Sequence, residues 1–213
     1  MKNVIEKVTA FITRNRNQKT ELLLIQHPNA GIQIPSGTVE NGETVKKALK
    51  REVAEETGLK HIHIKNYIGY MDIILPDNQF MLLERSKVYS RPNPTSFDWA
   101  ELRKGIQVTV NRTFDAYTQI TYIEYDRYPN PDYVTYNITG WVPTNILCKK
   151  RRRHFYHVLV SEELQDEWEV FTDNHTFKLF WAPLTSLPQI VDPQDQWLEF
   201  VKHDLGYNFE QVK

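Results

Sequence analysis

The chain has 213 residues, of which 40% are apolar and 12% aromatic, enough for a substantial core in one enlarged domain or in one domain with an insertion. Its formal net charge of −1 gives no overall attraction to nucleic acid or to an anionic membrane. Cys148 is the only cysteine, which excludes a framework of internal disulfides. The N-terminus lacks the apolar run of a signal peptide, and no stretch is long enough to cross a membrane. These features predict a cytoplasmic protein.

The first sixty residues predict two strands followed by a helix. The strands are expected over 4–13 and 21–26, with a polar turn between them. A break at Pro35-Ser36-Gly37 and a turn at Asn41-Gly42 precede the helix, and Gly58 supplies its C-terminal stop. The last turns of this helix carry Glu52, Glu55 and Glu56.

Three carboxylates are unfavourable at this place. Each one loses roughly 0.3–1 kcal/mol against the negative end of the helix dipole. At about 100° per residue, Glu52 and Glu56 fall in the sector of the apolar stripe, and Glu55 borders it. The acids should therefore point toward the protein, where a cation is needed to compensate their charge. Glutamate oxygens suit a hard divalent ion such as Mg²⁺ or Mn²⁺.

The alternative is an ordinary solvated surface helix, but a longer pattern argues against it. Residues 37–59 resemble the box of the Nudix hydrolase family, G-x5-E-x7-R-E-U-x-E-E-x-G-U, in which U is aliphatic. The specified positions are filled by Gly37, Glu43, Arg51, Glu52, Val53, Glu55, Glu56, Gly58 and Leu59. The seven positions of the box that require one residue type would all be matched by chance at a fraction of roughly 10⁻⁸ of the possible starting positions in a sequence.

The resemblance implies roles for these residues. Glu52, Glu55 and Glu56 would bind Mg²⁺ or Mn²⁺, joined by the backbone carbonyl of Ser36, where many relatives have glycine. Arg51 would orient the glutamates, and Gly37 and Glu43 would support the loop from behind the ligands.

The family hydrolyses a pyrophosphate bond in a nucleoside diphosphate linked to another moiety. Of the candidate catalytic residues Glu55, Glu52 and Arg51, Glu55 is the first expected base and Glu52 the second, although a base from a distant loop stays possible. Many relatives carry a further acid in a loop like the acidic segment 161–169, where Glu163 and Glu167 are the candidates. An exposed turn is the alternative interpretation of that segment.

The strand-rich order with few helices predicts the α+β class. The resemblance implies an α/β/α sandwich with a mixed sheet, formed by a single domain over 1–213. A β-rich insertion is expected at about 91–154, with strands over 105–110, 119–125 and 133–138. Its six tyrosines suit either packing on the core or on a dimer partner, or a base-stacking lid. The basic run 149–153 suits either a solvated loop or a surface for phosphates, RNA or another chain.

The sequence leaves the substrate open. A nucleoside triphosphate, a nucleotide sugar, a dinucleotide polyphosphate and a capped RNA end all fit, and no other nucleic acid is expected as a partner. A homodimer is possible. The alternative function is a non-catalytic Nudix module that binds a nucleotide as a sensor. The complete set of glutamates favours the enzyme.

Overall fold

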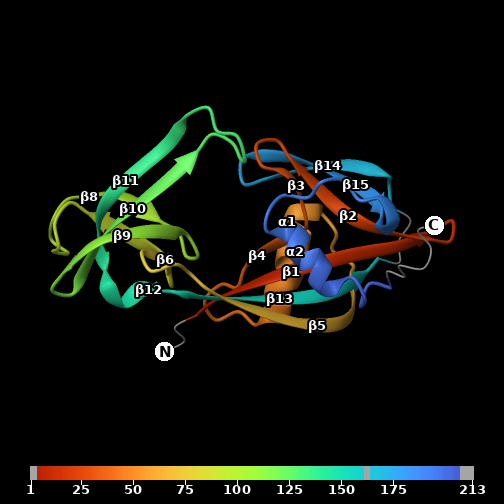
Figure 1. Cartoon of the computed structure of the whole chain (residues 1–213), viewed down its shortest axis with the longest axis horizontal. Helices are drawn as coiled ribbons and strands as arrows, with labels where there is room; N and C mark the ends of the chain where they lie inside the picture. The colour runs from red at the N-terminus through yellow and green to blue at the C-terminus, as the bar shows by residue number, and fades with distance from the viewer. Residues whose placement is uncertain (1–3, 161–163, 207–213) are drawn as a thin grey trace. The chain divides into compact units, whose positions relative to one another are not determined.

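The computed structural model describes residues 4–160 and 164–206. Figure 1 shows the order of the elements within these residues. The helices are α1 (Val45–Thr57) and α2 (Gln194–Val201), with short 3-10 turns η1 (Thr144–Ile146) and η2 (Leu184–Ser186). The strands are β1 (Val4–Arg16), β2 (Lys19–His27), β3 (Gly31–Gln33), β4 (Ser36–Thr38), β5 (His63–Ile74), β6 (Gln79–Leu82), β7 (Ser86–Tyr89), β8 (Asp98–Leu102), β9 (Gln107–Phe114), β10 (Tyr117–Tyr125), β11 (Val134–Pro143), β12 (Leu147–Cys148), β13 (Lys150–Leu159), β14 (Glu167–Thr172) and β15 (His175–Pro183).

The chain divides into two compact units, which are described separately. The helix-bearing unit comprises Val8–Gly37, Glu43–Tyr70 and Arg153–Lys213. The β-rich unit comprises Met1–Lys7, Thr38–Gly42 and Met71–Arg152. A single domain with an insertion at 91–154 stays a prediction.

The helix-bearing unit contains most residues of an eight-stranded sheet. Its main path runs β14-β15-β2-β1-β13-β5, while β3 pairs with β2 and β4 pairs with β1. Leu22, Leu23 and Leu24 are consecutive in β2 and all fully buried. Because neighbouring side chains of a strand point to opposite faces, protein must cover both faces of this strand. Sheets with few helices confirm the predicted α+β class.

Helix α1 has defined ends. The Thr44 side chain accepts a hydrogen bond from the Lys47 N–H, a standard N-cap. At the other end Gly58 adopts φ 75°, and its N–H donates to the Ala54 carbonyl. Helix α2 packs Trp197 and Phe200 near the ring of Phe155 on β13, with centroids 6.4 and 5.4 Å away. Both helices therefore have fixed places in this unit.

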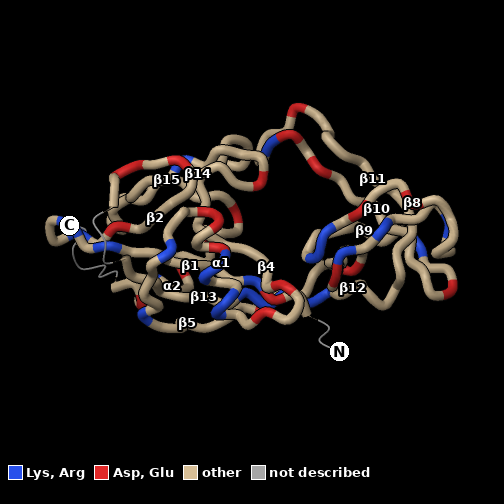
Figure 2. Tube along the Cα trace, turned by 180° about the vertical axis from the view of Figure 1, so that it is seen from behind, with Lys and Arg blue, Asp and Glu red and all other residues tan. Residues whose placement is uncertain are grey.

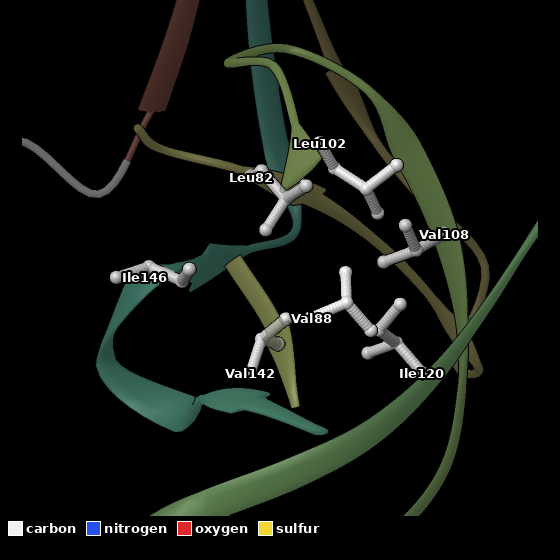
Figure 3. Close-up of a cluster of buried hydrophobic side chains, with 7 residues drawn as sticks. All are labelled: Leu82, Val88, Leu102, Val108, Ile120, Val142 and Ile146. Carbon is white, nitrogen blue, oxygen red and sulfur yellow. The ribbon is translucent and has the colours of Figure 1, made fainter. Parts of the chain in front are cut away.

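The β-rich unit holds a seven-stranded sheet in the order β12-β6-β9-β10-β11-β7-β8. Seven side chains drawn in Figure 3 form its core, namely Leu82, Val88, Leu102, Val108, Ile120, Val142 and Ile146. Three of its strands, β9, β10 and β11, match those expected near 105–138. Beyond the core, the hairpin of β10 and β11 exposes Tyr125, Tyr133 and Tyr136 to 51%, 64% and 55%.

Two local expectations were wrong. The sequence over 81–89 predicts a single strand, but β6 ends at Leu82 and β7 begins at Ser86. For the basic run 149–153, the solvated loop, one of its two interpretations, is wrong because β13 begins at Lys150. Within it, Arg152 donates two hydrogen bonds to Asp72 at 2.7 and 2.8 Å. The strand geometry gives these cations internal partners, which a count of charges does not reveal.

Cys148 lies in β12 and is 4% exposed. Burial raises the pKa of its thiol above the ordinary value.

Basic and acidic residues are both spread along the chain trace (Figure 2), in keeping with the small net charge. Over 4–160 and 164–206, no helix is both long and apolar enough to span a membrane.

Candidate functional site

The C-terminal end of α1 is anchored to its surroundings. Besides the Gly58 cap, the indole N–H of Trp168 on β14 donates to the Thr57 carbonyl at 2.8 Å. The Thr57 hydroxyl in turn donates to the Val53 carbonyl at 2.5 Å. Carbonyls in the last turn of a helix lack partners within it, so the bond from Trp168 satisfies the Thr57 carbonyl, which would otherwise need water. The turns that carry the glutamates are thereby held in place.

The carboxylate of Glu56 is strongly perturbed by its surroundings. Its Oε2 accepts a hydrogen bond from the Ser36 N–H at 2.8 Å. The residue keeps some exposed surface, but protein atoms enclose its carboxyl, and burial raises its pKa to about 8. Glu52 and Asp173 raise this pKa further, whereas the Ser36 N–H and Arg153 lower it. A nearby cation would offset this cost of charging Glu56.

Glu52 reaches the same place from one turn earlier. A Cβ atom built on Gly37 would lie only 1.9 Å from the Glu52 Cδ. Glycine at position 37 is therefore what allows this carboxylate to lie against the backbone of β4. Glu52 and Glu56 thus converge on the Ser36-Gly37 segment.

Arg51 connects three of the acids. Its Nε and Nη2 donate to the two carboxylate oxygens of Glu43 at 3.1 and 3.0 Å. Its Nη1 lies 2.9 Å from both Glu52 Oε1 and Glu55 Oε2. These contacts, first among them that with Glu43, raise the pKa of Arg51 above its ordinary value. Arg51 thus supplies part of the positive charge that is expected beside these glutamates.

The three predicted metal ligands are not arranged alike. Glu52 and Glu56 face Ser36 and Gly37, whereas Glu55 turns to Arg51 with its side chain 51% exposed. Within the described part of the chain, no group of three or more His, Cys, Asp or Glu side chains is placed to hold a metal ion. Protein sites for Mg²⁺ often use only one or two carboxylates, with water and substrate phosphates completing the shell. The two converging carboxylates fit such an ion, and the oxygen donors suit its chemistry.

The candidates for a further acid have separate outcomes. Glu163 lies outside the described residues. Glu167 is the first residue of β14 and forms an ion pair with Lys178 at 2.6 Å.

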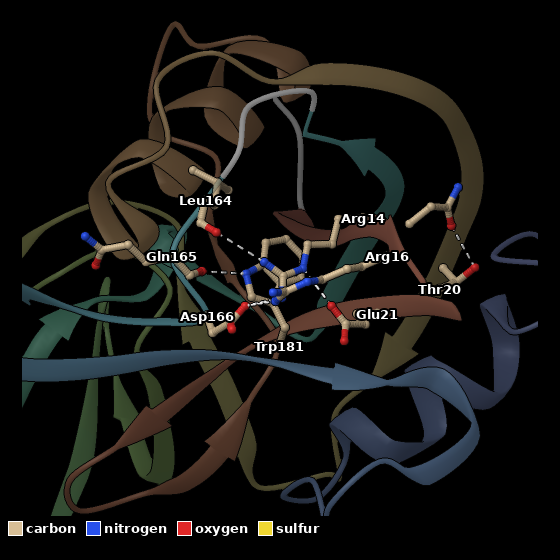
Figure 4. A network of polar contacts seen from close by, with 9 residues as sticks. Arg14, Arg16, Thr20, Glu21, Leu164, Gln165, Asp166 and Trp181 are labelled. Atoms are coloured by element: carbon tan, nitrogen blue, oxygen red, sulfur yellow. Dashed lines mark hydrogen bonds and ion pairs between the residues drawn. The ribbon is translucent and has the colours of Figure 1, made fainter. Parts of the chain in front are cut away.

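The segment just before Glu167 is tied down, as Figure 4 shows. Arg14 donates to Asp166 Oδ1 at 2.8 Å, and the indole of Trp181 donates to the Gln165 carbonyl at 3.3 Å. The guanidinium of Arg14 also lies 4.4 Å from the centroid of the Trp181 ring.

Two residues near Glu56 escaped the sequence interpretation. Asp173 belongs to the turn between β14 and β15, where its φ of 49° is left-handed, and Asp-Asn at such a place signals only a turn. Arg153 is 6% exposed, donates to Thr9 Oγ1 at 2.9 Å and stacks 3.8 Å from the Trp197 ring. The strand period within the basic run could have indicated that this arginine points inward.

Residues 6–107 match the sequence profile of the NUDIX domain. The chain carries a NUDIX domain. The family resemblance predicted from the box is thereby confirmed. The match spans the whole box and ends within β9, so residues 108–213 lie outside it.

Curated relatives resemble parts of the NUDIX domain. A Caenorhabditis elegans protein named as a nudix hydrolase is 45% identical over 60 residues, which cover 26% of this chain and 16% of that protein. The NAD-capped RNA hydrolase NudC of Vibrio parahaemolyticus is 34% identical over 90 residues, 40% of this chain and 32% of its own length. The chain thus spans less than a third of either relative.

Solved structures of NUDIX proteins are more distant. The NUDIX domain of Shewanella oneidensis NrtR, solved in complex with ADP ribose, aligns with a TM-score of 0.46 at 14% identity, covering 96% of this chain and 90% of that one. The MutT protein of Methanosarcina mazei aligns with a TM-score of 0.44 at 15% identity, covering 94% and 95%.

Proposed function

We propose that this NUDIX domain is a divalent-metal-dependent hydrolase that cleaves a pyrophosphate bond in a nucleoside diphosphate linked to another moiety. The observation that carries the proposal is the convergence of Glu52 and Glu56 on the Ser36-Gly37 segment. Two carboxylates in so small a space repel both each other and a pyrophosphate, so the arrangement makes chemical sense as a receptor for a cation that the substrate shares.

Each residue has a distinct part in this proposal. Glu52, Glu56 and the Ser36 carbonyl would hold Mg²⁺ or Mn²⁺, and Glu55 would join them. When bound, the ion neutralises phosphate oxygens and makes water more acidic. Arg51, clamped by Glu43, fixes the directions of Glu52 and Glu55. Glu55 is half exposed, so water and substrate can reach it, and it is the first candidate to accept the proton of the attacking water.

The test is a panel of substrates with and without Mg²⁺ or Mn²⁺. The panel contains a nucleoside triphosphate, a nucleotide sugar, ADP-ribose, a dinucleotide polyphosphate and, because one relative acts on it, NAD-capped RNA. Hydrolysis of at least one substrate should require the metal. Glu55→Gln should lower kcat by about 10²–10⁴-fold if Glu55 is the base. Glu84→Gln is the matched control, because Glu84 is an exposed glutamate of the β-rich unit.

The same panel of substrates distinguishes the hydrolase from a non-catalytic sensor. A protein that binds a nucleotide without hydrolysing any member, with wild type and Glu55→Gln equally inactive, would refute the enzyme and favour the sensor. Crystals soaked with Mn²⁺ would test the ligands, since anomalous density away from Glu52 and Glu56 would refute their assignment. Cytoplasmic location and a homodimer stay part of the proposal.

A further inference from the structure

The β-rich unit contains a cavity of about 400 Å³. That volume lies within the range of small-molecule sites, roughly 300–1,000 Å³. Its floor is apolar. Leu102 belongs both to the lining and to the core drawn in Figure 3, and Ile106 and Ile138 of the lining pack against that core. None of these residues belongs to the Nudix box.

The wall is formed where β10 and β11 extend beyond the core. Tyr122 pairs with Ile138 and Glu124 pairs with Tyr136 in the antiparallel register. Directly opposed residues share a face of the sheet, so both tyrosines and Glu124 lie on the side that continues the core. Tyr136 is 55% exposed and lines the cavity. An aromatic face is thus available to a planar ligand.

The lining also presents polar and charged groups. The Tyr122 hydroxyl donates to Glu124 Oε2 at 2.7 Å, and burial, then Glu124, raises the pKa of Tyr122. Tyr122 therefore stays a neutral donor, and Glu124 keeps acceptor sites for another partner. Arg103 also lines the cavity and acts electrostatically on Tyr122, without an ion pair to any of the described residues. Arg85 and Glu101 form an exposed pair at 3.3 Å.

We infer that this cavity binds a guanine nucleotide, with Tyr136 stacking on the base, Glu124 accepting its hydrogen bonds and Arg103 contacting a phosphate. Carboxylates only accept, and guanine is the base that presents two adjacent N–H donors, N1–H and N2–H, on one edge. Stacking on an aromatic ring and an arginine near a phosphate are general means of binding a nucleotide. The ligand is either a free nucleotide or one nucleotide of a single-stranded RNA.

The experiment measures binding of GMP, AMP and a short guanine-containing RNA to the full chain by calorimetry. The probe GMP has no phosphoanhydride, so the hydrolase proposed for the NUDIX domain cannot consume it. GMP should bind at least about tenfold more tightly than AMP. Tyr136→Ala and Arg103→Gln should each weaken GMP binding about tenfold. Glu124→Gln should remove the preference for GMP over AMP.

Tyr125→Ala is the matched control, because Tyr125 is an equally exposed tyrosine of the same hairpin that does not line the cavity. It should leave GMP binding within about twofold. If the RNA binds more tightly than GMP, the natural ligand is a nucleotide within single-stranded RNA. If the two bind equally, the ligand is a free nucleotide. Both results support the site. No GMP binding at millimolar concentration, equal binding of AMP, or equal losses in Tyr136→Ala and Tyr125→Ala would overturn it. Melting temperatures of all variants verify that they are folded.

Discussion

The Nudix helix end and the cavity of the β-rich unit assemble their charged groups in different ways. At the helix end, Arg51, Glu52, Glu55 and Glu56 come from six consecutive residues, and every acid has a partner within a few ångströms. In the cavity, charged and aromatic side chains come from segments between residues 85 and 138, and they border an apolar core. Local spacing suffices to recognise the first arrangement, whereas the second exists only after strands have paired.

The comparison implies that the core of the β-rich unit can be weakened while the helix end stays intact. Ile120→Ala removes a fully buried side chain of that core and should cost about 2–5 kcal/mol of unfolding free energy. Urea unfolding followed by tryptophan fluorescence measures the loss. Ile123→Ala, at a 45% exposed position of the same strand, is the control. An equal loss in both variants would contradict the assigned core.

The helix-bearing unit should respond to acid through His157. Burial, and after it Lys65, lowers the pKa of this histidine to about 4, and its Nε2 lies 2.7 Å from Thr13 Oγ1. The unfolded chain therefore takes up the proton first as the pH falls. The stabilisation is complete above about pH 6.5 and is lost toward pH 4, up to about 3 kcal/mol. His157→Gln should flatten this part of the curve of unfolding free energy against pH. An unchanged slope would show that other groups cause it.

The helix end should be sensitive to a single methyl group. Gly37→Ala places a Cβ where the Glu52 carboxylate lies, so this carboxylate must move. A displaced ligand should lower kcat/KM on the substrate found in the panel by about 10- to 100-fold.

Gly42→Ala is the comparison for that variant, because no atom lies within 4 Å of the added Cβ. Its φ of 77° should cost some stability but leave Glu52 in place. If the two variants were equally active, the absence of a side chain at Gly37 would not matter for the position of Glu52 in the site.

The smallest effect concerns the anchor of α1. Trp168→Phe keeps the ring but removes the hydrogen bond to the Thr57 carbonyl, which should cost about 0.5–1.5 kcal/mol of unfolding free energy. Trp181→Phe removes a longer, exposed hydrogen bond and should cost less. If Trp181→Phe lost more stability than Trp168→Phe in thermal unfolding, the hydrogen bond from Trp168 to the Thr57 carbonyl would not be the stronger of the two.

In the helix-bearing unit the sequence predicted the first two strands and the first helix. Helix α1, its Gly58 stop and the inward direction of Glu52 and Glu56 follow from local periodicity and capping. Asp173 could not be predicted near Glu56, because 117 residues of chain separate them and only the pairing of β14 with β15 fixes its turn.

Prediction was weaker in the β-rich unit. Alternation revealed β9, β10 and β11, but the break between β6 and β7 has no strong turn signal at residues 83–85. The ion pairs of the basic run depend on contact between β13 and Asp72, which lies 80 residues away. Long-range pairing, not composition, decided these points.

The burial of Cys148 gives the protein an internal reporter. It is the sole thiol of the chain, it lies in the β-rich unit, and its raised pKa keeps little thiolate available. A disulfide reagent should therefore label it slowly, at a rate set by transient opening of the strands around it. Labelling of Cys148 should accelerate in Ile120→Ala but not in Trp168→Phe. The absorbance of the released reagent would therefore report the transient opening of the β-rich unit alone.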